Sequence, residues 1–99
     1  MVKHIVMWKL KDFAEGKSKD ENIEYIKAEL EGLALVIPQI NFLEVGKNML
    51  PDAEHDAVLY SEFESPEDLE VYQNHPAHKK IAGYIAKIRD GRVSGDYMV

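Results

Sequence analysis

The sequence predicts one α+β domain, spanning residues 1–99, with a four-stranded antiparallel sheet and its helices on one face. Three observations lead to this prediction. Four short segments alternate apolar and polar residues, which is typical of strands. Two strong helix-start signals lie between these segments. The elements also follow one another in the order β-α-β-β-α-β, which is a known way of building such a sheet.

The first predicted strand covers residues 2–10. One face carries every second residue, namely Val2, His4, Val6, Trp8 and Leu10. The other face is charged at its ends and apolar at Ile5 and Met7. A strand that is apolar on both faces is covered on both sides. The domain's own helices would supply one cover, and a second molecule would supply the other.

The first predicted helix begins after a polar stretch, residues 11–17, that contains Gly16. Ser18 and Glu21 have the spacing of a capping box, in which each side chain accepts from the other residue's backbone amide. Pro38 is expected to end the helix. The apolar residues that follow the cap recur at steps of three and four and form one stripe: Ile23, Ile26, Leu30, Leu33 and Ile37.

Two further strands are predicted at residues 40–47 and 57–63, joined by a polar loop. In the first, Leu43 and Val45 share one face, and Ile40 and Phe42 share the other. In the second, the alternation places Leu59 and Phe63 on one face and Val58 and Tyr60 on the other.

The second helix has the clearest start, with Ser65 as the cap and Pro66 at the first helical position. Pro76 is expected to interrupt it, and a second piece follows with isoleucines on one stripe. Asp90-Gly91 is expected to end that piece with a residue that tolerates positive φ. Residues 92–99 then form the closing strand.

This order predicts a ferredoxin-like monomer whose sheet is bare on the face opposite the helices. Ile5, Met7 and Tyr60 are expected on the bare face. An apolar face of this kind in a globular protein marks an interface. We therefore expect two sheets to stack face to face in a homodimer, a dimeric α+β barrel. Covering of the face by the chain's own loops is the alternative.

Composition excludes several classes of function. The chain has no cysteine, which rules out disulfides, zinc–thiolate sites and thiol nucleophiles. Its net charge of −6, without a run of basic residues, argues against partners such as nucleic acid or anionic membranes. No stretch is long and apolar enough for a transmembrane helix, and no export signal is evident, so a cytoplasmic location is expected.

The segment Tyr72–His78 carries the candidate chemistry, because a tyrosine and two histidines surround a helix break. His4 lies on the strand face assigned to the helices. Together these groups would form the polar end of an apolar chamber, and burial would lower an imidazole pKa. The alternative is structural: His75 satisfies loose backbone groups, while Tyr72 and His4 are core residues. No fixed spacing of histidines indicates a metal site.

The sequence resembles the stress-responsive dimeric α/β-barrel family, called Dabb. The likeness covers essentially the whole chain. Its most specific parts are Val2-Lys3-His4 and His75-Pro76-Ala77-His78, and it extends to Val45-Gly46-Lys47, Phe63-Glu64-Ser65 and Asp96-Tyr97. This resemblance implies a ferredoxin-like monomer that forms a barrel-like dimer through its sheets. The family has no single defined reaction.

One plant branch of that family cyclises linear polyketides without a cofactor, and the resemblance carries its site onto this chain. Tyr72 and His78 match the branch's acid–base pair. The matching pocket positions are His4, Val6, Trp8, Ile26, Leu30 and Leu59, and His75 is added here as a substrate-binding candidate. Trp8 replaces a smaller apolar residue and narrows the pocket. Some members hold magnesium on backbone carbonyls, which would be those of Ala34, Ile37 and Ile40.

Three hypotheses about function follow. The first is binding of a small apolar or aromatic molecule between sheet and helices, with cofactor-free proton transfer if any reaction occurs. His78 would then be the general base and Tyr72 the orienting donor. The second is a non-catalytic stress protein whose assembly is its function. The third is a cofactor-free monooxygenase or haem-degrading enzyme, which rests on shared architecture alone.

Overall fold

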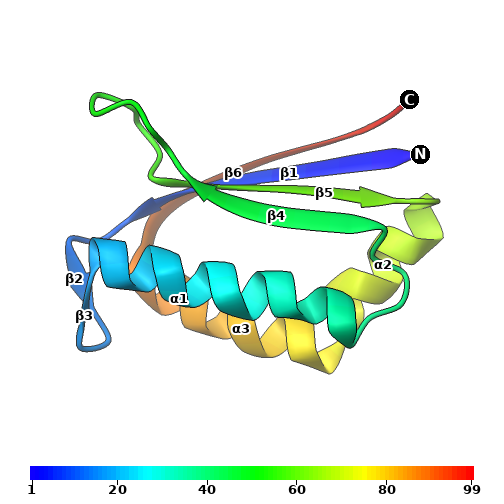
Figure 1. Ribbon diagram of the computed structural model, residues 1–99, viewed down its shortest axis with the longest axis horizontal. Helices are drawn as coiled ribbons and strands as arrows, with labels where there is room; N and C mark the ends of the chain where they lie inside the picture. The colour runs from blue at the N-terminus through cyan, green and yellow to red at the C-terminus, as the bar shows by residue number, and fades with distance from the viewer.

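A computed structural model describes all residues from Met1 to Val99. Figure 1 shows a twisted sheet on one side and the helices packed beneath it on the other. Along the chain the elements are β1 (Val2–Leu10), β2 (Phe13–Ala14), β3 (Lys17–Ser18), α1 (Lys19–Gly32), η1 (Leu33–Leu35), β4 (Phe42–Lys47), β5 (Ala57–Phe63), α2 (Pro66–Asn74), α3 (Pro76–Ile88) and β6 (Arg89–Met98).

The main sheet has the strand order β4-β5-β1-β6, and every neighbouring pair is antiparallel. The strand β1 pairs with β5 on one side and with β6 on the other, so it lies in the interior of the sheet. The chain ends meet at one side, where the Met1 ammonium donates to the Val99 carbonyl at 3.0 Å. The predicted ferredoxin-like α+β fold is confirmed.

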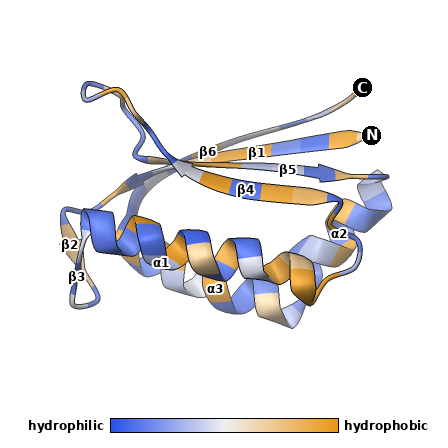
Figure 2. Cartoon of the chain, viewed as in Figure 1, coloured by the Kyte–Doolittle hydropathy of each residue, from blue (hydrophilic) through white to orange (hydrophobic).

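The hydrophobic core lies between the sheet and the helices. The even residues of β1 are all buried, and Trp8 is only 5% exposed. The predicted stripe of α1 is buried as well, with Ile26 and Ile37 fully inaccessible. Figure 2 shows hydrophobic stretches in β1 and β4 and bands of hydrophobic residues along the helices. The periodicity of the sequence therefore identified the core faces of β1 and α1 correctly.

The polar stretch after β1 is not a plain loop, because β2 and β3 form a small antiparallel hairpin within it. Glu15 and Gly16 connect the two strands with φ angles of 51° and 77°. Two successive residues at positive φ match the twist of a tight hairpin. Glu-Gly is not the usual sequence for this turn, which is why the alternation rule overlooked it.

Three predicted boundaries are wrong. The helix α1 ends at Gly32 and continues as the 3-10 turn η1, a common tightening of a last helical turn. Ile40 lies outside β4, because its amide donates to the Ile37 carbonyl in a turn instead of pairing in the sheet. Its side chain is buried. The helix α3 ends at Ile88 rather than at Asp90-Gly91, and β6 begins at Arg89 rather than at Arg92, so Gly91 lies within a strand that pairs with β1.

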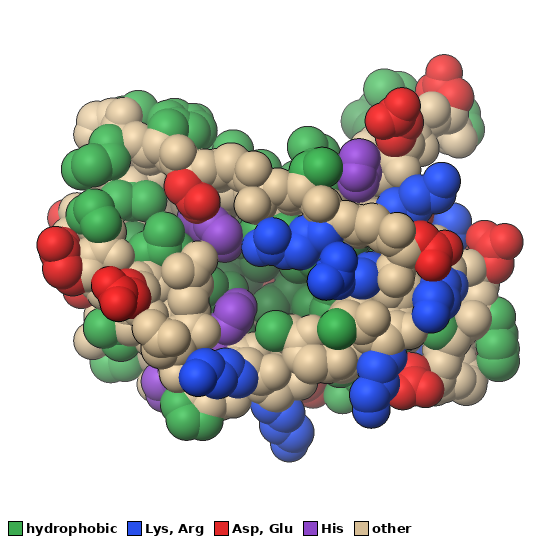
Figure 3. Space-filling model, turned by 180° about the vertical axis from the view of Figure 1, so that it is seen from behind, with side chains coloured by type: hydrophobic (Ala, Val, Ile, Leu, Met, Phe, Trp, Pro, Cys, Tyr) green, Lys and Arg blue, Asp and Glu red, His purple; other side chains and the backbone are tan.

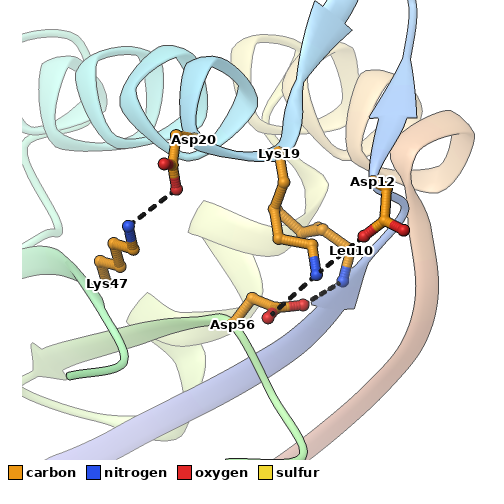
Figure 4. Close-up of polar contacts among 6 residues, drawn as sticks. All are labelled: Leu10, Asp12, Lys19, Asp20, Lys47 and Asp56. Carbon is orange, nitrogen blue, oxygen red and sulfur yellow. Dashed lines mark hydrogen bonds and ion pairs between the residues drawn. The ribbon is translucent and has the colours of Figure 1, made fainter. Parts of the chain in front are cut away.

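Asp56 fixes the end of β1, as Figure 4 shows. Its carboxylate accepts the Leu10 amide at 2.8 Å, and its own amide donates to the Trp8 carbonyl at 2.8 Å. Lys19 lies 3.4 Å from the carboxylates of both Asp56 and Asp12. These contacts fix the backbone of Trp8 and Leu10 at the end of β1.

The edge strand β4 is covered by side chains of α1. The Glu31 carboxylate accepts the Val45 amide at 3.0 Å, and the Lys27 ammonium donates to the Val45 carbonyl at 2.7 Å. Lys27 and Glu31 also pair with each other, and this contact lowers the pKa of the Glu31 carboxyl. An edge strand with satisfied backbone groups is protected from pairing with another chain.

The sheet face opposite the helices is open in the monomer. Ile5, Met7 and Tyr60 are half-buried there by their neighbours, while Phe42 and Val93 are 45% and 44% exposed. The pairing register places these side chains on the same face, because residues opposite one another in a ladder point the same way. None of the helices is both long and hydrophobic enough to span a bilayer.

Candidate functional site

A chamber of about 150 Å³ lies between the sheet and the helices. Figure 3 shows a hollow on the rear of the molecule with histidine side chains at it and basic side chains along it. Side chains from β1, α1, β5, α2, α3 and β6 line this chamber: His4, Val6, Trp8, Leu30, Leu59, Tyr72, Gln73, His78, Ala82, Ile85, Arg89 and Arg92. Most of the lining is apolar, which is the usual construction of a small-molecule site.

Most of the predicted site residues meet in this chamber, namely His4, Val6, Trp8, Leu30, Leu59, Tyr72 and His78. Two do not. Ile26 is fully buried in the core and does not reach the chamber. His75 lies in a separate shallow depression beside Glu67 and Asn74. The sequence placed His75 near the helix break but gave no indication of the side to which it points.

The break between α2 and α3 follows from Pro76, which has no amide hydrogen to donate to Tyr72. The Tyr72 carbonyl accepts the His75 amide instead, at 3.2 Å. His75 adopts an extended backbone conformation, as a residue before proline does, and its Nδ1 accepts the Ala77 amide at 3.0 Å. In an unbroken helix the Ala77 amide would bond the Gln73 carbonyl, so the cap leaves that carbonyl free.

The ring of His78 forms a hydrogen bond with this free carbonyl. Its Nδ1 lies 3.1 Å from the Gln73 oxygen, and since a carbonyl only accepts, Nδ1 carries the hydrogen. The other nitrogen, Nε2, therefore holds the lone pair of the neutral ring. Burial lowers the pKa of His78, and the bond to Gln73 opposes this only in part. The geometry favours a neutral imidazole with a defined tautomer at neutral pH.

Tyr72 lies beside His78 with the two ring centroids 4.5 Å apart. It is 1% exposed and also packs against Phe63 at 5.1 Å. Burial raises the pKa of its phenol, which the charge of Arg92 offsets only in part. Its hydroxyl makes no hydrogen bond within the chain, so it remains a protonated donor available to a molecule in the chamber.

His4 completes the polar end of the chamber. It is 4% exposed, its ring meets the Tyr72 ring edge-on at 6.3 Å, and its Nδ1 bonds the Asp96 carboxylate. His4 and Asp96 are opposite one another in the β1–β6 ladder. Alternation alone does not pair these two residues, because the register of the closing strand is needed to place Asp96 on the helix side of the sheet.

Five lining residues were not predicted: Gln73, Ala82, Ile85, Arg89 and Arg92. Arg92 is opposite Trp8 in the ladder and so points to the same face. Arg89 is the first residue after α3. Arg89 is opposite Leu10, and a shift in register between Lys9 and Leu10 brings it to the same side of the sheet as Arg92. Alternation alone does not reveal this shift, so the sequence carries no signal for the pair.

No cluster of three or more His, Cys, Asp or Glu side chains is present. The magnesium ligands implied by the family resemblance would be the carbonyls of Ala34, Ile37 and Ile40. The Ile37 carbonyl already accepts the Ile40 amide at 3.2 Å, and both residues are buried. A carbonyl oxygen has two lone pairs, so the Ile37 oxygen keeps one beside this hydrogen bond, and the magnesium site stays a prediction.

Fold and site together define a ferredoxin-like domain with a small-molecule-sized chamber between its sheet and helices. The chain belongs to the family of stress-responsive A/B barrel domains, Dabb, whose sequence model matches residues 2–99. The resemblance inferred from the His-Pro-Ala-His segment and the opening strand is thereby confirmed. No curated protein matches the sequence.

Solved structures similar to this chain share its fold over nearly its whole length. A dimeric protein of unknown function from Bacteroides fragilis is 35% identical with a TM-score of 0.90, and the match covers 99% of this chain and 95% of that one. A protein from Arabidopsis thaliana is 25% identical, with a TM-score of 0.84 and coverage of 100% and 95%. A hydroxynitrile lyase from Passiflora edulis is 20% identical, with a TM-score of 0.83 and coverage of 99% and 92%. The last likeness concerns the fold alone.

Proposed function

We propose that this protein is a homodimer that binds a small apolar or aromatic carbonyl compound in each chamber and moves a proton on it without a cofactor. One observation carries the proposal: Tyr72 and His78, predicted as an acid–base pair, lie ring to ring at 4.5 Å and line the same chamber. A buried donor and a neutral base around an apolar cavity are the groups that enolisation of a ketone requires.

The chemistry needs only groups of this chain. The Nε2 of His78 takes a proton from the carbon beside the carbonyl, and the electron pair of that C–H bond moves to the carbonyl oxygen. The Tyr72 hydroxyl donates a hydrogen bond to the developing enolate oxygen, where a positioned donor is most effective. The imidazolium then returns its proton to carbon or oxygen. Positioned acid–base groups of this kind accelerate reactions by about 10²–10⁴-fold.

The dimer part of the proposal rests on the open sheet face. The Bacteroides fragilis relative, at 35% identity, is described as dimeric. In this chain the open face carries Ile5, Met7 and Tyr60 near its centre with Phe42 and Val93 beside them. Stacking two such faces would remove this apolar area from water, and it would leave the chambers free because they lie on the helix side of each sheet.

Exchange of carbon-bound hydrogen tests the catalytic part directly. Phenylacetone in D₂O exchanges its benzylic hydrogens slowly, and proton NMR follows the loss of their signal. The native protein is expected to accelerate this exchange above the rate in buffer. His78→Ala should return it to the buffer rate, and Tyr72→Phe should reduce it about tenfold.

The matched control is His75→Ala, which removes a histidine three residues away that does not line the chamber. This variant should exchange as the native protein does. Equal exchange in the native protein and in His78→Ala, with both folded by circular dichroism, would contradict the proposed role of His78.

A further inference from the structure

Both arginines of this chain line the chamber. The sequence has 12 basic residues, and all but Arg89 and Arg92 are lysines. Both belong to β6, in which Arg89 is the first residue, and both are exposed to solvent, so they lie at the mouth of the chamber rather than in its apolar interior. The only two guanidinium groups of this acidic protein therefore lie together at the opening of the chamber.

Neither arginine has a carboxylate partner. The six ion pairs of the structure involve lysines and His4. The one side-chain hydrogen bond of Arg92 is a long contact of 3.4 Å to the Ser94 hydroxyl, and the Arg89 side chain makes none. Two like charges near each other are unfavourable without an anion between them. The mouth therefore carries two guanidinium groups without an ion-pair partner, and a planar guanidinium can donate two parallel hydrogen bonds to a carboxylate.

The size of the chamber limits what can carry that carboxylate. An apolar cavity of about 150 Å³ is large enough for a benzene ring. Trp8, the largest of the lining side chains, occupies space on the β1 side of the chamber. The space between the two histidines and the arginines consequently suits one ring or a short branched chain.

We infer that the ligand of the chamber is a small carboxylic acid of single-ring size. Its apolar body lies against Val6, Leu30 and Leu59, and its carboxylate is held by Arg89 and Arg92. This inference rests on the proposed function, since it names the substrate class of the same site. The reacting carbon then faces Tyr72 and His78, and the carboxylate stays at the mouth as an anchor that takes no part in bond breaking.

Calorimetric titration of matched probes tests the inference. Phenylacetate and phenylacetamide have nearly the same shape and differ in charge. The native protein should bind phenylacetate about tenfold to hundredfold more tightly than phenylacetamide, the gain expected for charge-assisted hydrogen bonds. Arg92→Gln and Arg89→Gln should each reduce that preference, and the double variant should abolish it, with a far larger loss of affinity for phenylacetate than for phenylacetamide.

Lys80→Gln is the matched control. It removes one positive charge from an exposed position of α3 that does not line the chamber, and it should retain the preference for phenylacetate. Higher salt should weaken phenylacetate binding and leave phenylacetamide unaffected.

The outcomes distinguish a chamber that does not select carboxylates from a chamber that binds no small molecule. Equal affinity of the two probes, or a preference that survives the double arginine variant, would overturn the carboxylate inference while the chamber still binds a small molecule. Absence of binding of both probes to the native protein would overturn the inference together with the proposed binding function.

Discussion

The Nδ1 of His78 lies 3.1 Å from the carbonyl oxygen of Gln73, a carbonyl that the helix break at Pro76 has released. Through this contact the helix break determines that Nδ1 of His78 carries the hydrogen and Nε2 the lone pair. Pro76 thus has two effects: it separates α2 from α3, and it leaves free the carbonyl that orients the His78 ring. A prediction about pH follows from the same contact.

Exchange activity should depend on pH as expected for a neutral imidazole base. Burial places the pKa of His78 below its ordinary value of 6.5. The base form is lost only as pH falls through this lowered pKa, so activity should be constant at neutral pH and decline only below 6.5. Burial of Tyr72 raises the pKa of its phenol, so no alkaline decline should appear up to pH 9. A midpoint above 6.5 in the rate of phenylacetone exchange would be inconsistent with this assignment.

His75 should act on stability and not on binding. Its Nδ1 caps α3 by accepting the Ala77 amide, and loss of a cap costs about 0.5–2 kcal/mol. Urea denaturation should therefore show His75→Ala to be about 1 kcal/mol less stable, with most of the loss restored in His75→Asn. Phenylacetone affinity should be unaltered in both variants. Loss of affinity without loss of stability would assign His75 to the site after all.

Trp8 should control the size of the ligand. It lines the chamber and is only 5% exposed, so Trp8→Leu enlarges the space at the β1 side. The variant should lose about 1–3 kcal/mol of stability, less than truncation of a tryptophan to alanine in a closed core. In a thermal-shift assay, 4-phenyl-2-butanone should gain affinity relative to phenylacetone. An unchanged order of the two ketones would show that another residue limits the chamber.

The open sheet face should be the dimer interface. Ile5 lies near its centre opposite Tyr60 and Gly95, and a charge there would be buried between two sheets. Analytical ultracentrifugation should find the native protein dimeric and Ile5→Glu monomeric. Leu35→Glu, which adds the same charge at a position that is 91% exposed, should remain dimeric. A native monomer, or a dimeric Ile5→Glu, would place the interface elsewhere.

The fold was largely predictable because its signals are local. Alternation in β1 and β5 and the caps at Ser18 and Ser65 depend only on residues close together in sequence, and all four are confirmed. The errors concern contacts between distant segments. Gly91 looked like a helix terminator, yet pairing of β6 with β1 from Arg89 onward imposes an extended backbone on it.

The site was predictable in part, for the same reason. Side chains on β1 face the helices by alternation, so His4 and Trp8 were placed correctly relative to the core. Tyr72 and His78 come together through the break at Pro76, whose geometry the sequence does not give. Asp96 and Arg92 reach the site through the ladder of the last strand, and that register depends on contacts across more than 80 residues.

Titration of the four histidines with phenylacetone tests the central claim most directly. Two of them, His4 and His78, line the chamber, while His55 and His75 do not. Their ring nitrogens can be followed separately by long-range ¹H–¹⁵N NMR. The account predicts saturable shifts at His4 and His78 with a single affinity, and constant positions for His55 and His75. Unchanged signals from all four histidines, or shifts confined to His55 and His75, would contradict a ligand site between the sheet and the helices.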